Sequence, residues 1–201
     1  VYPEQDELEA VRLEALRKAL VGAELEVAVE LGGEYMIDRR FQRHLSEGRV
    51  RTLGAGSEAF LIELHHTGDV PSYLEELLFK AKLEGLTPVL AHPERYHLER
   101  SWAMVERLAQ RGVVLLVNLG ALVGRYGFVI KRRARRLLRT GLVRALASDA
   151  HAVTDVEEGV VPGIAWLRKK GGDEAVELAL NHNIRALLRG VTTLDDLDPL
   201  F

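Results

Sequence analysis

Short apolar segments alternate along this chain with longer segments of helical periodicity, and this alternation limits the possible folds more than any other feature. The apolar segments predict strands over residues 25–33, 58–66, 87–91, 113–118 and 142–151. The segments between and after them, together with 4–20, predict helices over 36–48, 71–85, 101–112, 127–140, 155–172 (with a break at Pro162), 173–182 and 184–190. Such alternation is typical of a parallel α/β sheet or barrel covered by helices. Because no linker or repeat interrupts 1–201, we expect one domain.

The composition narrows the classes of function. With 201 residues and 47% hydrophobic content, the chain is long enough to bury a core. Its 27 basic and 30 acidic residues give a net charge of −3, which does not favour binding to a polyanion. The absence of cysteine excludes disulfides and thiolate metal sites, so any metal must be held by His, Asp and Glu. Since we find neither a membrane-length apolar run nor a signal peptide, we expect a cytoplasmic protein.

Polar side chains recur at one place in the pattern, at or just past the carboxyl end of each predicted strand. They are Glu34, Glu63, His92, Asn118, Asp149 and His151. The carboxyl ends of parallel strands meet at one edge, where α/β barrels build their active sites. Carboxylates and imidazoles gathered there form a ligand set that suits zinc, manganese or iron(II). A bound cation would also relieve the repulsion between the acids.

Each of these residues also has an ordinary structural interpretation. Taken alone, Glu34 is better explained as an exposed acid in a glycine-rich turn, and Glu63 as the end of a strand that becomes exposed. His92 fits a turn before proline, and His151 fits a helix cap made together with Asp149. The joint pattern favours a site, because these interpretations give no reason for one edge to collect such residue types.

The remaining histidines are interpreted as loop residues. They are His44, His65, His66, His97 and His182. His65 and His66 follow Glu63 directly, but adjacent strand residues point to opposite faces, so we do not expect them to share one ion.

Arg95 is a candidate anion-binding residue. It lies three positions after His92, and its guanidinium can grip an anionic group with two parallel hydrogen bonds. The ordinary alternative is a surface ion pair with Glu94 or Glu99. A metal site beside a fixed arginine is suited to the hydrolysis of phosphate esters, since the metal activates water and the arginine orients the phosphoryl oxygens.

Four segments carry a family resemblance: "GGEYMID", "FLIELHHTGDVPSYLEELLFKAKLEGLTPVLAHPERY", "VNLGALVGRYG" and "ALASDAH". In order and spacing they resemble successive motifs of the bacterial PHP-type (polymerase and histidinol phosphatase) protein tyrosine phosphatases, which are associated with capsule and exopolysaccharide regulation. The resemblance runs from about Tyr2 to beyond His151. It implies a distorted (β/α)7 barrel and a metal cluster, commonly trinuclear, that hydrolyses protein phosphotyrosine by metal-activated water. The implied metal is manganese, with zinc and iron as alternatives.

The resemblance also implies roles for individual residues. Glu34 would be a bridging carboxylate, and Glu63 and His92 would complete the ligands of one metal. Asp149 and His151 would serve the other metals. Arg95 would contact the phosphate as the catalytic residue. The implied partner is a phosphotyrosine protein, with a bacterial tyrosine kinase as one candidate.

The chain departs from the family pattern at both ends of the site. It begins at Val1 and has neither the Asp-x-His-x-His segment nor the Thr-Pro-His segment, and Ala152 stands where relatives often have Asn. We therefore expect an N-terminally truncated, incomplete barrel lacking its first strands, and oligomerisation over the open edge. Two other functions stay open. One is a catalytically impaired remnant with a binding or regulatory role, and the other is a PHP phosphoesterase acting on a small ester such as histidinol phosphate.

Overall fold

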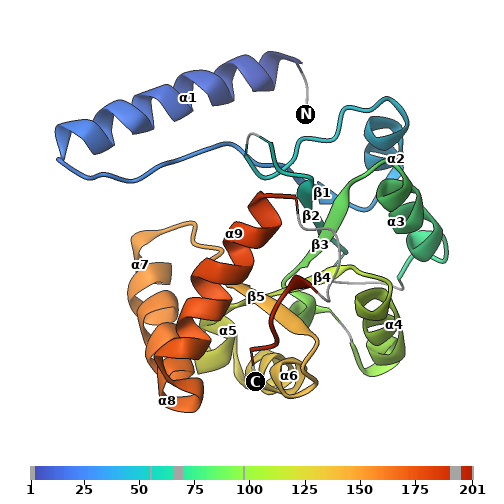
Figure 1. Cartoon of the computed structure of the whole chain (residues 1–201), viewed down its shortest axis with the longest axis vertical. Coiled ribbons are helices and arrows are strands. Elements are labelled where there is room, and N and C mark those ends of the chain that lie inside the picture. The colour runs from blue at the N-terminus through green and yellow to red at the C-terminus, as the bar shows by residue number, and fades with distance from the viewer. Residues whose placement is uncertain (1–2, 55, 66–69, 97, 191–195, 201) are drawn as a thin grey trace.

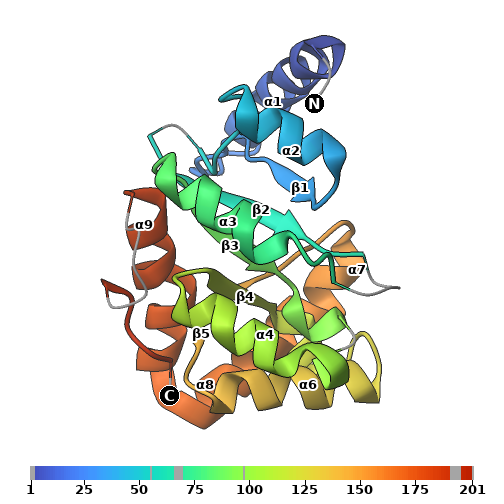
Figure 2. The ribbon, with the colours of Figure 1, turned by 90° about the vertical axis from the view of Figure 1, so that its right-hand side faces the viewer.

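A five-stranded, all-parallel sheet forms the centre of the computed structural model, which describes residues 3–54, 56–65, 70–96, 98–190 and 196–200. The strands lie side by side in sequence order (Figures 1 and 2). Their bounds are β1 (Glu34–Met36), β2 (Ala59–Glu63), β3 (Thr87–Ala91), β4 (Val114–Asn118) and β5 (Val143–Ala147). Each parallel connection needs a crossover, and helices supply it. The parallel α/β sheet expected from the alternation is confirmed.

Apart from α1, the helices of the described residues lie against the sheet on both faces (Figure 1). The first half of the chain contributes α1 (Pro3–Gly22), α2 (Arg39–Ser46), α3 (Leu74–Leu83), the 3₁₀ turn η1 (Pro93–Arg95) and α4 (Leu98–Gln110). The second half contributes α5 (Leu119–Val123), α6 (Phe128–Arg139), α7 (Val153–Asp155), η2 (Val156–Val160), α8 (Val161–Glu177), η3 (Leu178–His182) and α9 (Asn183–Leu188).

The strand side chains alternate between two apolar clusters. On β4, Leu115 and Val117 join the larger cluster, whereas Val114 and Leu116 join a smaller one that includes Leu187 of α9. Both faces of the sheet are therefore buried, which explains why the strands read as nearly continuous apolar runs.

The first predicted strand is wrong. Residues 25–33 have no regular structure, and the strand begins at Glu34 rather than ending before it. Leu25 and Val27 are 54% and 58% exposed, so their alternation does not mark a buried strand face. The Arg17 guanidinium donates to the Val29 carbonyl at 2.8 Å, so a backbone group in this segment bonds to α1 and not to a neighbouring strand.

Two smaller predictions also need correction. Neither His44 nor His182 is a loop residue, because His44 lies buried in α2 and His182 is the last residue of η3. Pro162 does not break its helix, although it lies where the helix changes type: the π-helical turn η2 ends at Val160, α8 begins at Val161, and the backbone angles of Val160 and Val161 stay helical. The break occurs instead at Gly172, whose φ of +72° is non-helical. His66 and His97 lie outside the described residues.

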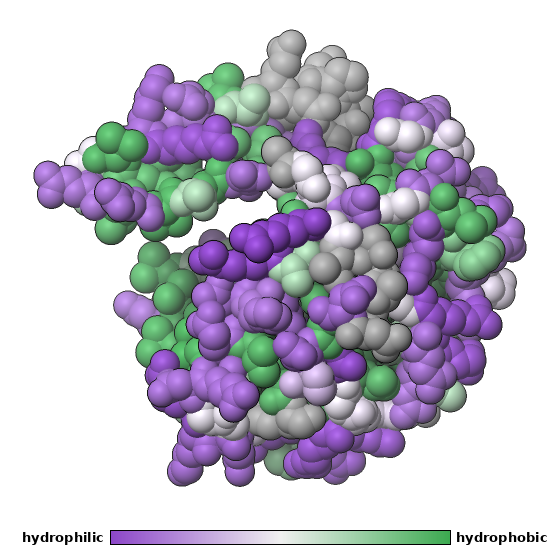
Figure 3. Space-filling view, viewed as in Figure 1, coloured by the Kyte–Doolittle hydropathy of each residue, from purple (hydrophilic) through white to green (hydrophobic). Residues whose placement is uncertain are grey.

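The sheet is open, because β1 and β5 each have a single neighbour among the described strands. Closure into the expected (β/α)7 barrel is therefore not observed. The arm formed by α1 and residues 23–33 extends away from the sheet (Figure 1), and apolar side chains are visible on it in the space-filling view (Figure 3). Val11 and Val21 of α1 are 67% and 77% exposed. Within the described part of the chain, no helix is both long and apolar enough to cross a membrane.

Candidate metal centre

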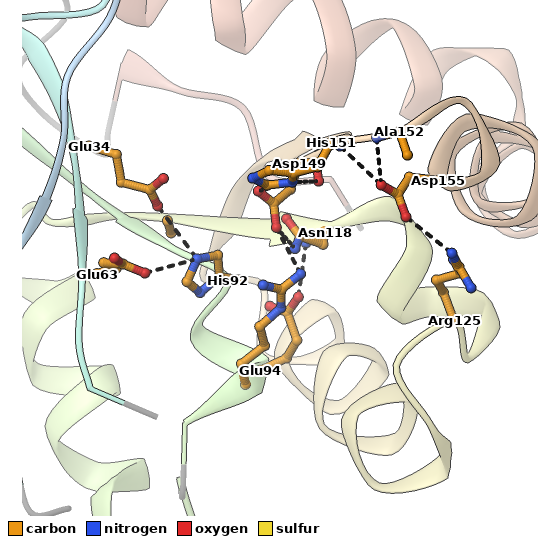
Figure 4. Close-up of polar contacts among 12 residues, drawn as sticks. Glu34, Glu63, His92, Glu94, Asn118, Arg125, Asp149, His151, Ala152 and Asp155 are labelled. Carbon is orange, nitrogen blue, oxygen red and sulfur yellow. Dashed lines mark hydrogen bonds and ion pairs between the residues drawn. The ribbon is translucent and has the colours of Figure 1, made fainter. Parts of the chain in front are cut away.

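Three adjacent strands bring Glu34, Glu63 and His92 together. Glu63 is the last residue of β2, and His92 follows the last residue of β3. Glu34 begins β1 level with Leu61, two residues before Glu63, so its long side chain reaches along the sheet toward the carboxyl edge. Figure 4 shows both carboxylates directed at the imidazole. Residues up to 58 positions apart are thus neighbours because parallel strands end at a common edge.

The geometry of this group fits a single cation. Nε2 of His92 lies 3.5 Å from a Glu34 oxygen and 3.7 Å from a Glu63 oxygen. One ligand atom from each residue can be chosen so that all three lie within 4.8 Å of one another. Two ligands bound about 2.1 Å from an ion in tetrahedral geometry lie roughly 3.4 Å apart, so the two distances from His92 are already close to those between bound ligands. Two carboxylates facing one imidazole nitrogen form a donor set that a divalent ion suits.

The backbone at this edge is strained at two positions. His92 has a φ of +36°, and Asp149, which follows β5, has a φ of +48°. A side chain with a Cβ rarely adopts such angles, and the conformation costs of order 1–3 kcal/mol. Both residues are among the predicted site residues. Strain of this kind clusters at functional sites, where surrounding contacts hold the chain in place.

Tyr96 orients the His92 ring. Its hydroxyl donates to the Ala91 carbonyl at 2.9 Å and accepts from the Leu64 N–H at 3.0 Å. Its oxygen also lies 3.2 Å from Nδ1 of His92. Because the single hydroxyl proton is used on Ala91, we assign the proton of the neutral imidazole to Nδ1. The lone pair then belongs to Nε2, the nitrogen that faces the two carboxylates.

Burial keeps the Tyr96 hydroxyl protonated, since it raises the pKa of this phenol well above its usual value. Tyr96 was not among the site residues predicted from the sequence. Its position four residues after His92, across a turn that begins with proline, is the signal that could have identified it.

Arg95 and Asn118 hold Asp149. Nη2 of Arg95 and Nδ2 of Asn118 donate to the same Asp149 oxygen, at 2.7 and 2.9 Å. The guanidinium also stacks on the Tyr126 ring, with its central carbon 4.3 Å from the ring centre. The Nε–H of Arg95 is buried and has no hydrogen-bond partner among the described residues. Arg95 is therefore fixed by two neighbours and keeps donor capacity for an anion.

The alternative interpretation, a surface ion pair of Arg95 with Glu94, is wrong because Glu94 is buried inside the turn. The side chain of Glu99, the other partner considered, lies outside the described residues. Glu94 is fully buried, and one of its carboxylate oxygens accepts the backbone N–H of Asn118 at 3.1 Å. Burial raises the pKa of Glu94 to about 7, although the N–H groups of Glu94 and Asn118 act in the opposite direction. Glu94 thereby ties η1 to the end of β4.

His151 lies outside the three-residue group. Its side chain is 83% exposed, and its Nδ1 lies 3.0 Å from the carbonyl oxygen of Asp149. Among the described residues, the group suited to one ion contains neither Asp149 nor His151, and their assignment as ligands stays a prediction.

Asp155 organises the loop around His151. It accepts the backbone N–H groups of His151 and Ala152, both at 3.0 Å, and pairs with Arg125 at 3.2 Å (Figure 4). These donors lower the pKa of the Asp155 carboxyl. Asp155 was not among the residues predicted from the sequence, because the cap three positions before it is Ala152 and not one of the polar residues that mark a capping box.

Comparisons with known proteins agree on one family. Residues 2–189 match the family described as capsular polysaccharide synthesis, CpsB/CapC. The tyrosine-protein phosphatase YwqE of Bacillus subtilis is 30% identical over 178 residues, which cover 88% of this chain and 69% of YwqE. The Staphylococcus aureus protein CapC is 24% identical over 103 residues, which cover 51% of this chain and 40% of CapC.

A solved structure has the same fold. It comes from the crystal structures of YwqE and of CpsB from Streptococcus pneumoniae, described as metal-dependent tyrosine phosphatases. The match has a TM-score of 0.77 and 27% sequence identity, and it covers 92% of this chain and 75% of the other.

Proposed function

Because this chain belongs to the CpsB/CapC family, we propose that it is a metal-dependent protein tyrosine phosphatase. The observation that carries the proposal is the group formed by Glu34, Glu63 and His92, which fits one cation at the carboxyl edge of the sheet. The likeness to YwqE and to its solved relatives, which are metal-dependent tyrosine phosphatases, supports the choice of reaction. The absence of cysteine is consistent with it, since the phosphoryl group would go to water and not to a thiolate.

Glu34, Glu63 and His92 would hold the ion, with His92 presented by Tyr96. A divalent ion bound there supplies positive charge for the phosphoryl oxygens and lowers the pKa of a coordinated water. The protein supplies a rigid frame, because the three ligands stand on neighbouring strands of one sheet.

Arg95 would bind the phosphoryl group. In the structure its charge is balanced by Asp149, which Asn118 also holds. A phosphate ester would accept the donors that Asp149 does not use, so the guanidinium need not leave the Tyr126 ring to reach it. Asp149 and His151 remain proposed ligands for further ions.

The finer assignments belong to the same proposal. They are manganese as the metal, a PHP-like distorted (β/α)7 barrel, one domain over 1–201, a cytoplasmic location, a bacterial tyrosine kinase as substrate, and a homo-oligomer. The open sheet of the described strands supports an incomplete barrel and leaves β1 available for pairing. The donor set of oxygen and imidazole nitrogen accepts manganese, zinc or iron.

One observation favours a second candidate, a catalytically impaired binding or regulatory protein. The exposed position of His151 leaves a single three-residue group for a metal among the described residues. A centre with few ligands binds its ion weakly and turns over slowly.

Manganese-dependent hydrolysis of a phosphotyrosine peptide by this chain tests the proposal. We expect turnover to fall at least 100-fold in His92→Ala and in Glu63→Gln, because each substitution removes a ligand. His65→Ala is the matched control, since His65 is exposed and stands two residues after Glu63. Circular dichroism would establish that the variants are folded. Turnover without added metal, or turnover unchanged in both ligand variants, would contradict the proposal, and a folded chain that binds metal but hydrolyses nothing would favour the second candidate.

A further inference from the structure

Helix α6 concentrates positive charge on a chain that is acidic overall. Its sequence, FVIKRRARRLLR, contains six basic side chains and no acidic one, whereas the whole chain has a net charge of −3. The basic residues are Lys131, Arg132, Arg133, Arg135, Arg136 and Arg139. Crowding of like charges destabilises a helix by a few tenths of a kcal/mol per pair, so this concentration needs an explanation.

Two of these arginines have structural contacts. Arg133 donates to the Tyr96 carbonyl at 3.0 Å, and Arg135 donates to the Leu122 carbonyl at 2.9 Å. Both are only partly exposed. They join α6 to the loop after η1 and to α5, which accounts for their presence without any ligand.

The other three arginines form an exposed row. Arg132, Arg136 and Arg139 are spaced by four and three residues, which places them on one face of the helix. None of them has a carboxylate within ion-pairing distance among the described residues. Among the described side chains, which leave out residues 97–101, no carboxylate neutralises the charge of this row.

The row of arginines and neighbouring apolar side chains together line a groove. A concavity of about 410 Å³ lies between α4 and α6, and the row forms one of its walls. Phe128 and Val129, at the start of α6, line it although they are 74% and 55% exposed. The ring of Trp102 on α4 lies beneath the Arg136 guanidinium, 4.0 Å from its centre, and its indole N–H donates to Glu106. Trp102 thus holds Arg136 along the groove rather than free in solvent.

Hydrogen bonds through Tyr96 connect the groove to the candidate metal centre. Helices α4 and α6 both start on the side where the parallel strands end, as Figure 2 shows. Arg133, within the groove, bonds to the carbonyl of Tyr96, whose hydroxyl contacts His92. The groove is basic and partly apolar. A polypeptide whose phosphotyrosine enters the site would therefore meet this groove with the residues that flank the phosphotyrosine.

We propose that the groove between α4 and α6 binds an acidic segment flanking the phosphotyrosine of a protein substrate. This inference rests on the proposed function for its substrate. The 12 residues of α6 extend for about 18 Å at ~1.5 Å per residue, which matches roughly five residues of an extended peptide at ~3.3 Å per residue. Carboxylates would meet the row of arginines, and apolar side chains would rest on Phe128 and Trp102. A nucleic acid fits the groove less well than an acidic peptide does, because the groove is short and the rest of the molecule is acidic.

The test measures binding and turnover separately. Two fluorescent phosphotyrosine peptides of equal length are compared, one with five flanking Asp and Glu residues and one with Ser and Gly in their place. The protein variant is R132Q/R136Q/R139Q, which keeps good helix formers on α6. The control K169Q/K170Q/R189Q removes the same number of charges from exposed positions on α8 and after α9. Fluorescence anisotropy gives the affinity, and p-nitrophenyl phosphate measures turnover of a substrate with no flanking chain.

We expect the acidic peptide to bind about tenfold more tightly than the neutral one, because three exposed charge pairs are gained. The advantage should disappear in the α6 variant, persist in the control variant and shrink as salt is raised. Hydrolysis of p-nitrophenyl phosphate should be the same in all three proteins. Failure of the proposed function would appear as loss of metal-dependent hydrolysis in the wild type with the binding preference intact.

Three results would overturn the inference. They are equal binding of both peptides, an acidic preference that survives in the α6 variant, and tighter binding of a DNA oligonucleotide or of anionic lipid vesicles through the same arginines.

Discussion

His92 is held by its backbone and by its ring at the same time. A left-handed backbone turns the residue out of β3, and the Tyr96 hydroxyl contacts Nδ1. The position of His92 at the end of a predicted strand was enough to make it a candidate site residue. It could not reveal the ring contact, because that contact depends on how η1 folds back over β3.

Replacing Tyr96 tests the assigned tautomer. In Tyr96→Phe the acceptor for Nδ1–H is lost, so we expect manganese affinity to fall about 10- to 100-fold, as for other groups that orient metal ligands. Isothermal titration calorimetry measures the affinity. The ¹⁵N shifts of the metal-free histidine should show Nδ1 protonated in the wild type and a mixture of tautomers in the variant.

Tyr73→Phe is the matched control, because Tyr73 is exposed and makes no side-chain cap bond to α3. Tyr96→Phe should also lose roughly 1–3 kcal/mol of stability, since the buried N–H of Leu64 loses its acceptor. A stability loss of this size with unchanged metal affinity and an unchanged tautomer would refute the positioning role.

At the scale of elements, helix α2 depends on a buried histidine. His44 packs edge-on against Tyr35 of β1, with ring centres 5.9 Å apart, and joins Phe41 and Leu45 on the buried face of the helix. Burial, followed by nearby positive charges such as Arg49, lowers the pKa of His44 below the ordinary value of a histidine, 6.5. The folded protein therefore binds a proton at His44 less readily than the unfolded chain does.

The stability of the fold should consequently fall in acid. Below about pH 6.5 the unfolded chain binds the proton more tightly than the folded chain, so the free energy of unfolding decreases as the pH falls toward the lowered pKa. Urea titrations at pH 7.5 and 5.5 measure the difference. We expect His44→Leu to reduce the difference, and His65→Gln, at an exposed histidine, to retain it. An equal pH dependence in His44→Leu and the wild type would exclude this histidine as the cause.

The elements also show which sequence signals were reliable. Strands β2 to β5 were predicted because they are buried on both faces and read as apolar runs bounded by helices. Residues 25–33 alternate in the same way, yet they form no strand, and it is Gly33, at the very end of the segment, whose carbonyl accepts an N–H from β2 (Leu61, 3.1 Å). Alternation of apolar and polar residues indicates a possible strand, but a strand forms only where a neighbouring strand accepts its hydrogen bonds. Among the described strands, the one neighbour of β1 is β2.

At the scale of the whole molecule, the candidate metal centre joins three strands. Glu34 belongs to β1, Glu63 to β2, and His92 follows β3. The edge strand β1 is only three residues long and contributes few ladder hydrogen bonds. An ion held by these residues would therefore fasten the weakest strand to the rest of the sheet.

Metal should accordingly stabilise the fold. Manganese at about 100 times its Kd should add ~2.7 kcal/mol, or roughly 5–10 °C in Tm for a domain of this size. Differential scanning fluorimetry with and without manganese measures the shift. We expect Glu34→Gln to lose most of it, and Glu58→Gln, at the opposite end of β2, to keep it. A shift that is equal in both variants would place the ion elsewhere.

The sequence by itself determined the α/β class, the parallel sheet and the edge on which the polar residues gather. The reason is local, since side-chain periodicity and strand–helix alternation are written in neighbouring residues. Only the tertiary structure decided that the ligand atoms of Glu34, Glu63 and His92 lie close enough together to hold one ion, while the side chain of His151 is exposed to solvent. It also decided that Glu94 is buried, and that Arg95 pairs with Asp149 across 54 positions. These facts depend on contacts between segments that are distant in the sequence. A linear pattern does not encode the distances between such segments, so it cannot show which polar residues lie close enough to bind the same ion.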